Sequence, residues 1–347
     1  NQYTSLEICA GAGGQALGLE QAGFQHLALV EIESLACKTL KSNRPNWNVL
    51  NENVRDFSAK QYLNKVDLLA GGVPCPPFSV AGKQLGSDDE RDLFPDALRL
   101  VKECMPRAVL LENVRGLMDP KFNSYREAIL EKFQSIGYIG DWKVLNASDH
   151  GVPQLRPRAI LIMMRQEYAG FFKWPKPSGL NPPSVGEILY PLMKSEGWAF
   201  ADEWREKATG IAPTLVGGSK KHGGADLGPT RAKKAWAALG VDGHGLANHP
   251  PKNDFAEMPK LTMEMAALIQ GFPNEWKIEG KKTPAYRQVG NAFPPPVAKA
   301  LGLSIIAALE AGNNLLGQTL EITFNQLATC KDQQKDKVQK PDYASTL

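Results

Sequence analysis

Apolar runs with the composition of buried strands alternate with helical stretches through the first half of the chain. "YTSLEIC" leads into the glycine loop "AGAGG" and then into "QALGLEQAG", a helix that Gly23 should end. The runs "HLALVEI", "VDLLAGG", "RAVLLEN" and "RAILIMMR" are nearly continuous in apolar residues, which indicates burial on both faces. Strands that alternate with helices in this way predict an α/β fold built on a parallel, doubly wound sheet with helices on both faces.

The alternation breaks at "WPKPSGLNPP", residues 174–183, where proline and glycine stop both helix and strand. Helical character returns in "TMEMAALIQ" and in "VAKALGLSIIAALEAG", which Gly312 should end. A chain of 347 residues accommodates one large domain and a smaller one. We expect a large domain over 1–174 that a helix at about 286–312 completes, a small domain over 175–285, and a partly loose C-terminal extension over 313–347.

The composition argues against several classes of protein. No apolar run is long enough to span a bilayer, and the N-terminus has no basic region followed by an apolar stretch, so we expect a soluble, cytoplasmic protein without membrane contact. The five cysteines show no C-x-x-C spacing, which argues against a disulfide framework and against a metal site. Three of them, Cys9, Cys37 and Cys104, fall in apolar stretches and are predicted to be core residues.

Four unusual features each follow one of the predicted strands: the loop at Gly11, Glu31, the segment around Cys75, and Glu112. In open α/β sheets, ligands bind outside the carboxyl ends of the strands. We therefore expect these four features to converge at one edge of the sheet.

The loop "GAGGQA" matches the G-x-G-x-x-[G/A] fingerprint, and Glu31 lies twenty positions beyond Gly11, where a carboxylate can bind ribose hydroxyls. A plain tight turn is the alternative. The pattern favours an adenosine-type cofactor but does not separate NAD from S-adenosylmethionine. It contains no Arg or Lys that could bind a pyrophosphate, which argues slightly against a dinucleotide.

The segment "GGVPCPPFSVAG" sets Cys75 among three prolines, whose rings fix the backbone φ. A buried structural thiol is the commoner role of a single cysteine. A nucleophilic thiol needs nearby positive charge, because a free thiol is mostly protonated at neutral pH. Arg156 and Arg158 in "QLRPR" are the candidate cations, and their spacing of two predicts that both lie on one face of a strand.

Glu112 ends an apolar strand, where an unpaired carboxylate is costly, so a functional role is favoured over a cap for the following turn. A simple role for the adjacent Asn113 is to close that turn.

These segments together resemble the cytosine-5 DNA methyltransferases, and the resemblance covers the chain from Ser5 to about Leu309. The family's blocks occur in their usual order as "EICAGAGG", "LVEIE", "VPCPPFS", "RDLF", "ENVRGL", "QLRPRAILI", "LTMEMAALIQGFP" and "RQVGNAFPPPVA". Any single block is a weak match, whereas eight in the right order are highly specific. The resemblance implies a Rossmann-like, S-adenosylmethionine-dependent methyltransferase domain with a second, smaller target-recognition domain.

By resemblance, Cys75 is the nucleophile that adds to C6 of a cytosine whose C5 then takes the methyl group from S-adenosylmethionine, leaving S-adenosylhomocysteine. Glu112 would hold N3 and the amino group of the base. Arg158, with Arg156 behind it, would contact the base carbonyl and the covalent adduct, and Asn113 belongs to the same catalytic set. The cytosine must be flipped out of the duplex to reach these groups.

The resemblance also implies how the cofactor is held, with Glu31 on the ribose and Ile32 on the adenine. This chain departs from the family at Glu7 and Asn53, where the family usually has Asp, and at Pro76, where Gln commonly follows the cysteine. An amide oxygen at position 53 still accepts a bond from the adenine amino group, so we expect cofactor binding to survive. The expected cofactor-binding residues are Cys9, Gly11, Gly13, Gly14, Glu31, Ile32, Asn53, Pro74, Leu93 and Asn291.

The segment from about 175 to 260 stands where the family keeps its DNA-reading region, and the loop from Val80 to Arg91 would close over the base as a lid. From Lys207 to Lys234 the chain has six Lys or Arg residues and one acidic residue, so the net charge of this segment is +5. Such residues can contact phosphates, although a solvated basic face is the alternative for any single lysine. The expected DNA-binding residues are Ser79, Lys220, Lys221, His222, Arg231, Lys233 and Lys234.

Three other interpretations compete with this one. The family branch that methylates tRNA carries a Cys-Phe-Thr signature, which this chain lacks. An NAD-dependent oxidoreductase leaves Cys75 and Glu112 unexplained, and their presence with Arg158 argues against a non-catalytic DNA-binding relic. We therefore expect a monomeric DNA cytosine-5 methyltransferase of a prokaryotic restriction–modification system. Double-stranded DNA is its expected partner, and a cognate restriction endonuclease is inferred from the family alone.

Overall fold

The computed structural model describes residues 2–74, 92–217 and 224–338, with side chains as far as residue 318. Several residues with predicted roles lie outside the described residues. They are Cys75, Pro76, Ser79, the loop from Val80 to Arg91, Lys220, Lys221 and His222.

One seven-stranded sheet organises the larger part of the molecule. Its strands are β1 (Tyr3–Ile8), β2 (Phe24–Val30), β3 (Val49–Leu50), β4 (Leu68–Gly72), β5 (Ala108–Val114), β6 (Tyr138–Asn146) and β7 (Pro157–Arg165). The strand order is β3-β2-β1-β4-β5-β7-β6, and the pairs from β3 to β5 are parallel, as the alternation of strands and helices predicts.

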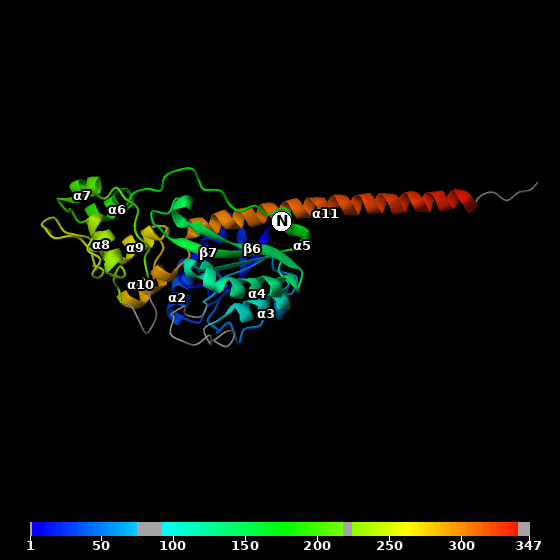
Figure 1. The fold of residues 1–347 in the computed structure, drawn as a ribbon, viewed down its shortest axis with the longest axis horizontal. Helices are drawn as coiled ribbons and strands as arrows, with labels where there is room; N and C mark the ends of the chain where they lie inside the picture. The colour runs from blue at the N-terminus through cyan, green and yellow to red at the C-terminus, as the bar shows by residue number, and fades with distance from the viewer. Residues whose placement is uncertain (1, 75–91, 218–223, 339–347) are drawn as a thin grey trace, which may run out of the picture.

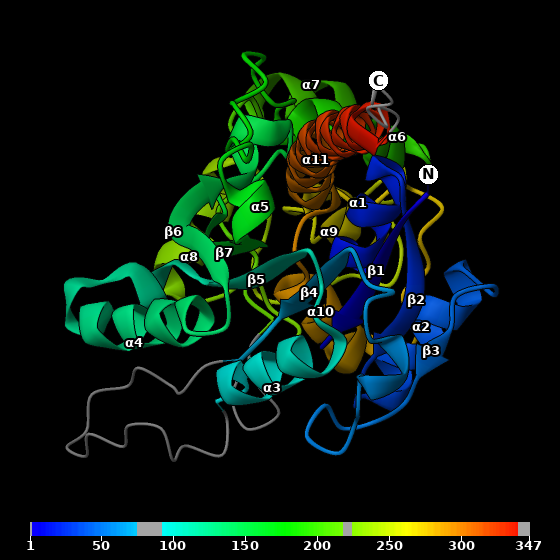
Figure 2. The ribbon, with the colours of Figure 1, turned by 90° about the vertical axis from the view of Figure 1, so that its right-hand side faces the viewer.

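Helices cover both faces of this sheet (Figure 2). The α-helices of the described residues are α1 (Gly14–Ala22), α2 (Ser34–Asn43), α3 (Phe94–Cys104), α4 (Asn123–Gln134), α5 (Gln166–Ala169), α6 (Val185–Lys194), α7 (Ala201–Lys207), α8 (Thr230–Ala238), α9 (Met263–Ile269), α10 (Lys282–Asn291) and α11 (Pro295–Val338). Leu100 of α3 and Phe133 of α4 pack on one face of the sheet, and Leu19 of α1 and Leu301 of α11 pack on the other. The doubly wound arrangement is therefore confirmed.

The prediction of a wholly parallel sheet is wrong at one edge, because β7 runs antiparallel to both β5 and β6. The physical reason lies in residues 147–156, which join β6 to β7 through a single turn of 3-10 helix. A parallel pair needs a crossover of a dozen or more residues. The sequence did not predict β6, because exposed residues alternate with its buried ones. This pattern is typical of a strand at the edge of a sheet, where β6 lies.

The helices α6 to α9 gather at one end of the molecule (Figure 1). They enclose a core that contains four buried tryptophans, Trp198, Trp204, Trp236 and Trp276. The sequence of this region shows poor periodicity because its helices are short and loops connect them. The same core continues into Ala12 and Leu17 beside the sheet, so the two regions pack together. The domain boundaries near residues 175 and 285 stay predictions.

The prediction that Gly312 ends the last helix is wrong, since α11 continues to Val338 and projects beyond the sheet (Figure 1). Gly312 instead permits a close approach, because a Cβ at this position would lie 2.4 Å from Cδ1 of Tyr168. By contrast, Gly23 ends α1 with a φ of 112°, as predicted. Cys37 and Cys104 are buried core residues, again as predicted.

One helical stretch among the described residues, Lys282–Gln318, is long and apolar enough to cross a membrane, which the sequence analysis did not anticipate. However, 61% of its most apolar window is buried inside the protein, as in the core helix of a soluble protein. The burial arises because α11 packs along α1 and α5.

We predict that Gly18→Ala destabilises the protein, although alanine is the better helix former. A Cβ at Gly18 would lie 2.3 Å from the carbonyl oxygen of Pro295, so α1 and α11 would have to separate. Overpacking of this kind costs about 1–3 kcal/mol. The measurement is the free energy of unfolding in urea. Gly170→Ala is the control, because a Cβ there meets nothing within 4 Å and the φ is −66°. Equal stability of the two variants would contradict this account of the helix contact.

Candidate active site

A pocket of about 660 Å³ lies at the carboxyl ends of β1, β2, β4 and β5, with α10 on its far side. Gly11, Glu31 and Glu112 all line it, as the strand ends predict. Pro74, the last described residue before Cys75, also lines it. The features that follow four separate strands therefore meet around one cavity, and its size is typical of small-molecule sites.

The glycine loop after β1 has a backbone that few side chains tolerate. The φ angles are 52° at Cys9, 54° at Gly11 and 84° at Gly13, all in the left-handed region. A Cβ at Gly14 would lie 2.1 Å from the carbonyl oxygen of Phe293, so this glycine lets α1 begin directly against the segment before α11. Cys9 lines the pocket and is partly exposed, which corrects its assignment to the core.

The Glu31 carboxylate contacts the backbone of this loop. It accepts hydrogen bonds from the backbone N–H groups of Gly11 and Glu33, each at 2.7 Å. Burial raises the pKa of Glu31 from its usual value. Each carboxylate oxygen has two lone pairs, so both retain capacity to accept a further bond from a ligand hydroxyl.

The predicted cofactor residues divide into two groups. Cys9, Gly11, Glu31, Pro74 and Asn291 line the pocket directly, and Asn291 comes from the end of α10. The other five do not line it. Of these, Ile32 is 59% exposed beside Glu31, and the backbone N–H of Leu93 donates to the carbonyl oxygen of Pro74 at 3.2 Å. Gly13 and Gly14 shape the loop, and Asn53 stands in a neighbouring turn.

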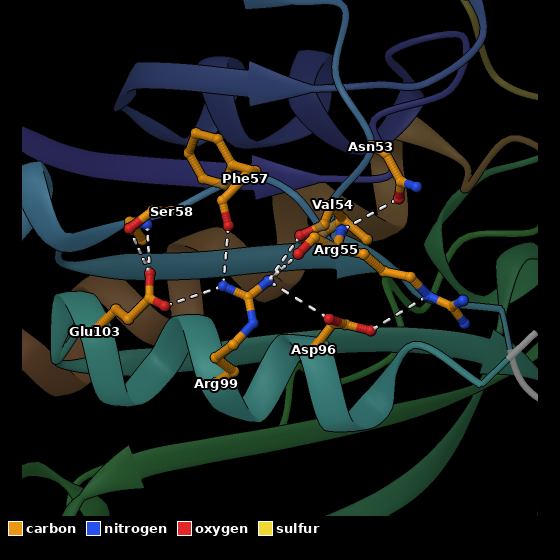
Figure 3. A network of polar contacts seen from close by, with 9 residues as sticks. Asn53, Val54, Arg55, Phe57, Ser58, Asp96, Arg99 and Glu103 are labelled. Atoms are coloured by element: carbon orange, nitrogen blue, oxygen red, sulfur yellow. Dashed lines mark hydrogen bonds and ion pairs between the residues drawn. The ribbon is translucent and has the colours of Figure 1, made fainter. Parts of the chain in front are cut away.

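A polar network that the sequence analysis missed fixes the turn that carries Asn53 (Figure 3). Arg99 of α3 donates to the carbonyl oxygens of Val54 at 2.8 Å and Phe57 at 2.9 Å. It also forms an ion pair with Glu103, one turn further along the helix. Because α3 begins directly after Leu93, this network ties that helix to the Asn53 turn. An arginine on an amphipathic helix gave no sequence signal for such a role.

Glu112 and Arg158 form a buried ion pair with an Oε1–Nε distance of 2.8 Å. The pair arises from strand register, because Arg158 on β7 lies opposite Val114, two residues beyond Glu112 on β5. Burial raises the pKa of Glu112, and the charge of Arg158 opposes that rise. Glu112 therefore sits at the wall of the pocket with one oxygen facing a fixed cation.

Asn113 closes the end of β5. Its side-chain oxygen accepts from the N–H of Val114 at 2.8 Å, and its amide donates to the carbonyl oxygen of Val73 at 2.8 Å. The second bond ties β5 to the segment that leads toward Cys75. This geometry favours the simple structural role that the sequence also allowed.

Arg156 does not share a strand face with Arg158, because β7 begins at Pro157. Its fully buried guanidinium donates to three carbonyl oxygens, those of Leu215 (2.8 Å), Gly290 (2.8 Å) and Ala292 (3.0 Å). The prediction of a common strand face is therefore wrong. The position of Arg156 favours a role in holding the site together.

Other residues at the pocket carried no predicted role. Glu7, Gln15, Arg287 and Gln288 all line it, and the first two are almost completely buried. Glu7 attracted notice only as a departure from the family, and the others gave no signal. Among the described residues, no group of three or more His, Cys, Asp or Glu side chains could hold a metal ion.

The described basic residues of the predicted DNA reader lie on α8. Lys233 forms an ion pair with Asp226 at 2.9 Å and is largely covered, which favours a structural role. Arg231 and Lys234 are exposed on the same helix. The remaining predicted DNA-binding residues lie outside the described part of the chain.

The family model of the C-5 cytosine-specific DNA methylases matches residues 3–307. The chain belongs to this family. It is 56% identical over 315 residues to the type II methyltransferase M.NgoMIV of Neisseria gonorrhoeae, covering 90% of this chain and all of that protein. It is also 56% identical over 309 residues to M.NaeI of Lentzea aerocolonigenes, covering 88% of this chain and 75% of that protein.

Solved structures of more distant proteins share the fold of the methyltransferase. A mutant of Spodoptera frugiperda DNMT2 superposes with a TM-score of 0.61 at 19% identity, covering 88% of this chain and 99% of that one. The Entamoeba histolytica methyltransferase EhMeth superposes with a TM-score of 0.62 at 15% identity, covering 89% of this chain and 99% of that one. The Rossmann-like methyltransferase fold is therefore confirmed.

The methyltransferase transfers a methyl group from S-adenosylmethionine to C5 of cytosine in DNA, as its family does. This conclusion removes the oxidoreductase and the non-catalytic relic as alternatives. The predicted roles of single residues stay predictions.

We predict that Arg156→Gln lowers the free energy of unfolding by about 3 kcal/mol, since buried carbonyl groups lose their donor. Urea denaturation of the variant measures the loss. Arg55→Gln serves as a control, because Arg55 is an exposed arginine whose ion pair with Asp96 spans 3.7 Å. Unchanged stability of the Arg156 variant, together with lost methyl transfer, would assign Arg156 to the chemistry instead.

Proposed function

We propose that this enzyme methylates a flipped-out cytosine within a specific double-stranded DNA sequence, as the modification enzyme of a restriction–modification system. The observation that carries the proposal is the buried Glu112–Arg158 pair at the wall of a pocket that Pro74 also lines. The type II names of the two relatives support the restriction–modification context. Action as a monomer in the cytoplasm, beside a cognate endonuclease, belongs to the same proposal.

The pocket suits an adenosine-type cofactor with an amino-acid tail. A Cβ at Gly11 would meet nothing within 4 Å, so the missing side chain leaves open space at the loop. Glu31 would accept from the ribose hydroxyls, and Ile32 and Leu93 would contact the adenine, with Asn53 accepting from its amino group. S-adenosylmethionine, when bound, supplies an electrophilic methyl group.

Each residue around the base has a separate role in the proposed reaction. The Cys75 thiolate adds to C6 of cytosine, and the electron pair of the C5–C6 bond becomes available at C5 for the methyl group. Glu112 holds N3 and the amino group, and its raised pKa suits a carboxyl that shares a proton with N3 as the adduct forms. Arg158 faces the base carbonyl and stabilises charge on the ring. Loss of the C5 proton and departure of the Cys75 sulfur then restore the aromatic base.

The helical end of the molecule would lie across the DNA from the sheet. Arg231 and Lys234 on α8 would contact phosphates, with Lys220, Lys221 and His222 nearby in the chain. Phosphate contacts fix the register of the protein on the duplex, whereas contacts to base edges select the sequence. Residues 175–285 are accordingly proposed as the target-recognition domain.

We predict that Cys75→Ser abolishes methyl transfer and that Glu112→Gln slows it by about 10²–10⁴-fold, because a neutral amide cannot share the proton with N3. The measurement uses radiolabelled S-adenosylmethionine with unmethylated genomic DNA and, in parallel, with tRNA, each digested to nucleosides after reaction. Label should appear in 5-methylcytosine with the wild-type enzyme. Cofactor affinity should stay unchanged in both variants. Full activity of either variant would refute its assigned role, and label in tRNA alone would refute the DNA substrate.

A second prediction concerns salt. The double variant Arg231→Gln/Lys234→Gln should bind all duplexes more weakly and reduce the slope of log K against log salt by about 2, near 0.9 for each lost phosphate contact. Lys233→Gln is the matched control on the same helix and should leave the slope unchanged, because Asp226 already pairs with Lys233. Electrophoretic mobility shifts over a salt series provide the data. A changed recognition sequence instead of a changed slope would show that α8 reads bases.

A further inference from the structure

A hydrogen bond joins the two sides of the chain that flank the predicted nucleophile. Pro74 directly precedes Cys75, and Leu93 is the residue before α3. The backbone N–H of Leu93 donates to the carbonyl oxygen of Pro74 at 3.2 Å. Pro74 is exposed and has no N–H of its own, so its backbone can be held by a hydrogen bond only through that carbonyl oxygen. The position of Pro74 therefore depends on how the backbone at Leu93 is held.

Asp92 holds the backbone at this point. It is only 6% exposed, and its Oδ1 atom accepts from the backbone N–H of Phe94 at 3.0 Å, where α3 begins. Its Oδ2 atom accepts from the hydroxyl of Tyr125 on α4 at 2.8 Å. A buried carboxyl group requires such donors, because burial without hydrogen bonds is costly. The Tyr125 hydroxyl thereby fixes the orientation of the side chain directly before Leu93.

The ring of Tyr125 packs on α3 independently of its hydroxyl. It lies edge-on to the ring of Phe94, with the two centroids 6.0 Å apart, and rests against the hydrophobic core. A pocket of about 160 Å³ lies beside it, and both Asp92 and Tyr125 line this pocket. Close packing fixes side chains only where no such space is left. The hydroxyl bond, rather than packing alone, therefore sets how Asp92 and Tyr125 lie relative to each other.

This contact lies away from the reacting groups. Neither Asp92 nor Tyr125 lines the cofactor pocket, whereas Pro74 does. On the other side of Pro74, the side-chain amide of Asn113 donates to the carbonyl oxygen of Val73 at 2.8 Å. Pro74 is thus held from β5 through Val73 and from α4 through Asp92. An effect of Tyr125 on the reaction must pass along the second of these connections.

We propose that Tyr125 is a positioning residue for methyl transfer. Through Asp92 and Leu93, its hydroxyl fixes Pro74 and with it the direction in which the chain continues to Cys75. The inference rests on the proposed role of Cys75 as the nucleophile, and it goes beyond that role by assigning the placement of Cys75 to a tyrosine of α4. Placement matters because a displacement of about 1 Å at reacting groups can cost about 10²-fold in rate.

The first variant is Tyr125→Phe, which removes the hydroxyl and keeps the ring that packs on Phe94. The measurement is transfer of labelled methyl groups to unmethylated genomic DNA in a single turnover, with the full-length enzyme in excess. We expect the rate constant to fall by about 10–100-fold. The concentration of S-adenosylmethionine that gives half the maximal rate should change little, because the residues that line the cofactor pocket are unchanged.

Tyr62→Phe is the matched control. Tyr62 is also partly buried against the same hydrophobic core, and its removal leaves the bond to Asp92 in place, so the rate should equal that of the wild type. Thermal unfolding separates positioning from stability. A merely structural hydroxyl would lower the melting temperature of Tyr125→Phe without slowing transfer below that temperature.

Variants of Asp92 test whether Tyr125 acts through it. Tyr125→Phe should cause no further loss in an Asp92→Ala enzyme, because the hydroxyl has already lost this acceptor. Asp92→Asn keeps an acceptor oxygen and should recover most of the rate lost in Asp92→Ala.

The outcomes that contradict the two proposals differ. A wild-type rate in Tyr125→Phe, or independent losses that multiply in the double variant, would overturn the role of Tyr125 alone. Methyl transfer by Cys75→Ser would instead refute the proposed nucleophile, and a wild-type enzyme that labels no cytosine in DNA would refute the proposed function.

Discussion

One buried guanidinium joins the start of β7 to the helical region of this methyltransferase and to the junction of α10 and α11. Arg156 binds the carbonyl oxygen of Leu215 from the helical region and those of Gly290 and Ala292 from the junction of α10 and α11. Asn291 lies between the last two, and Arg158 follows at the start of β7. The same contacts therefore position Arg158 beside Glu112 and Asn291 at the pocket. Arginine suits this task because its planar fork stays charged and presents several donors at fixed angles.

A second arginine performs a comparable task at α3. Arg99 holds the carbonyl oxygens of Val54 and Phe57, so the turn that carries Asn53 is fixed to α3. Because that helix begins shortly after the segment containing Cys75, the Asn53 turn and the chain that leaves this segment share one rigid element. Backbone carbonyl groups in loops have no regular partners, and here the buried Arg156 and the half-buried Arg99 donate to them.

The sequence predicts the parts of this structure that follow from local pattern. The strand ends after β1, β2 and β5 place Gly11, Glu31 and Glu112 at one edge because parallel strands share a direction. The antiparallel β7 was not predictable in this way, since its direction depends on the length of the connection from β6. The prediction for Gly312 was wrong because the sequence does not distinguish a glycine that ends a helix from one that permits a close approach, here to Tyr168. The contacts of Arg99 and Arg156 with backbone carbonyl groups could not be predicted, because those carbonyl groups are distant in sequence.

Three buried carboxyls, those of Glu7, Glu31 and Glu112, line one pocket in different surroundings. Glu112 faces Arg158, so its charge is partly compensated before any ligand arrives, and it can share a proton with a neutral base without a large change in local charge. Burial raises the pKa of Glu7, the backbone of Ala16 opposes that rise, and the charge of Glu31 adds to it. Glu31 accepts hydrogen bonds from the backbone N–H groups of Gly11 and Glu33. The three carboxyls thus differ in what surrounds them, because Glu112 faces an arginine whereas Glu7 and Glu31 contact backbone groups.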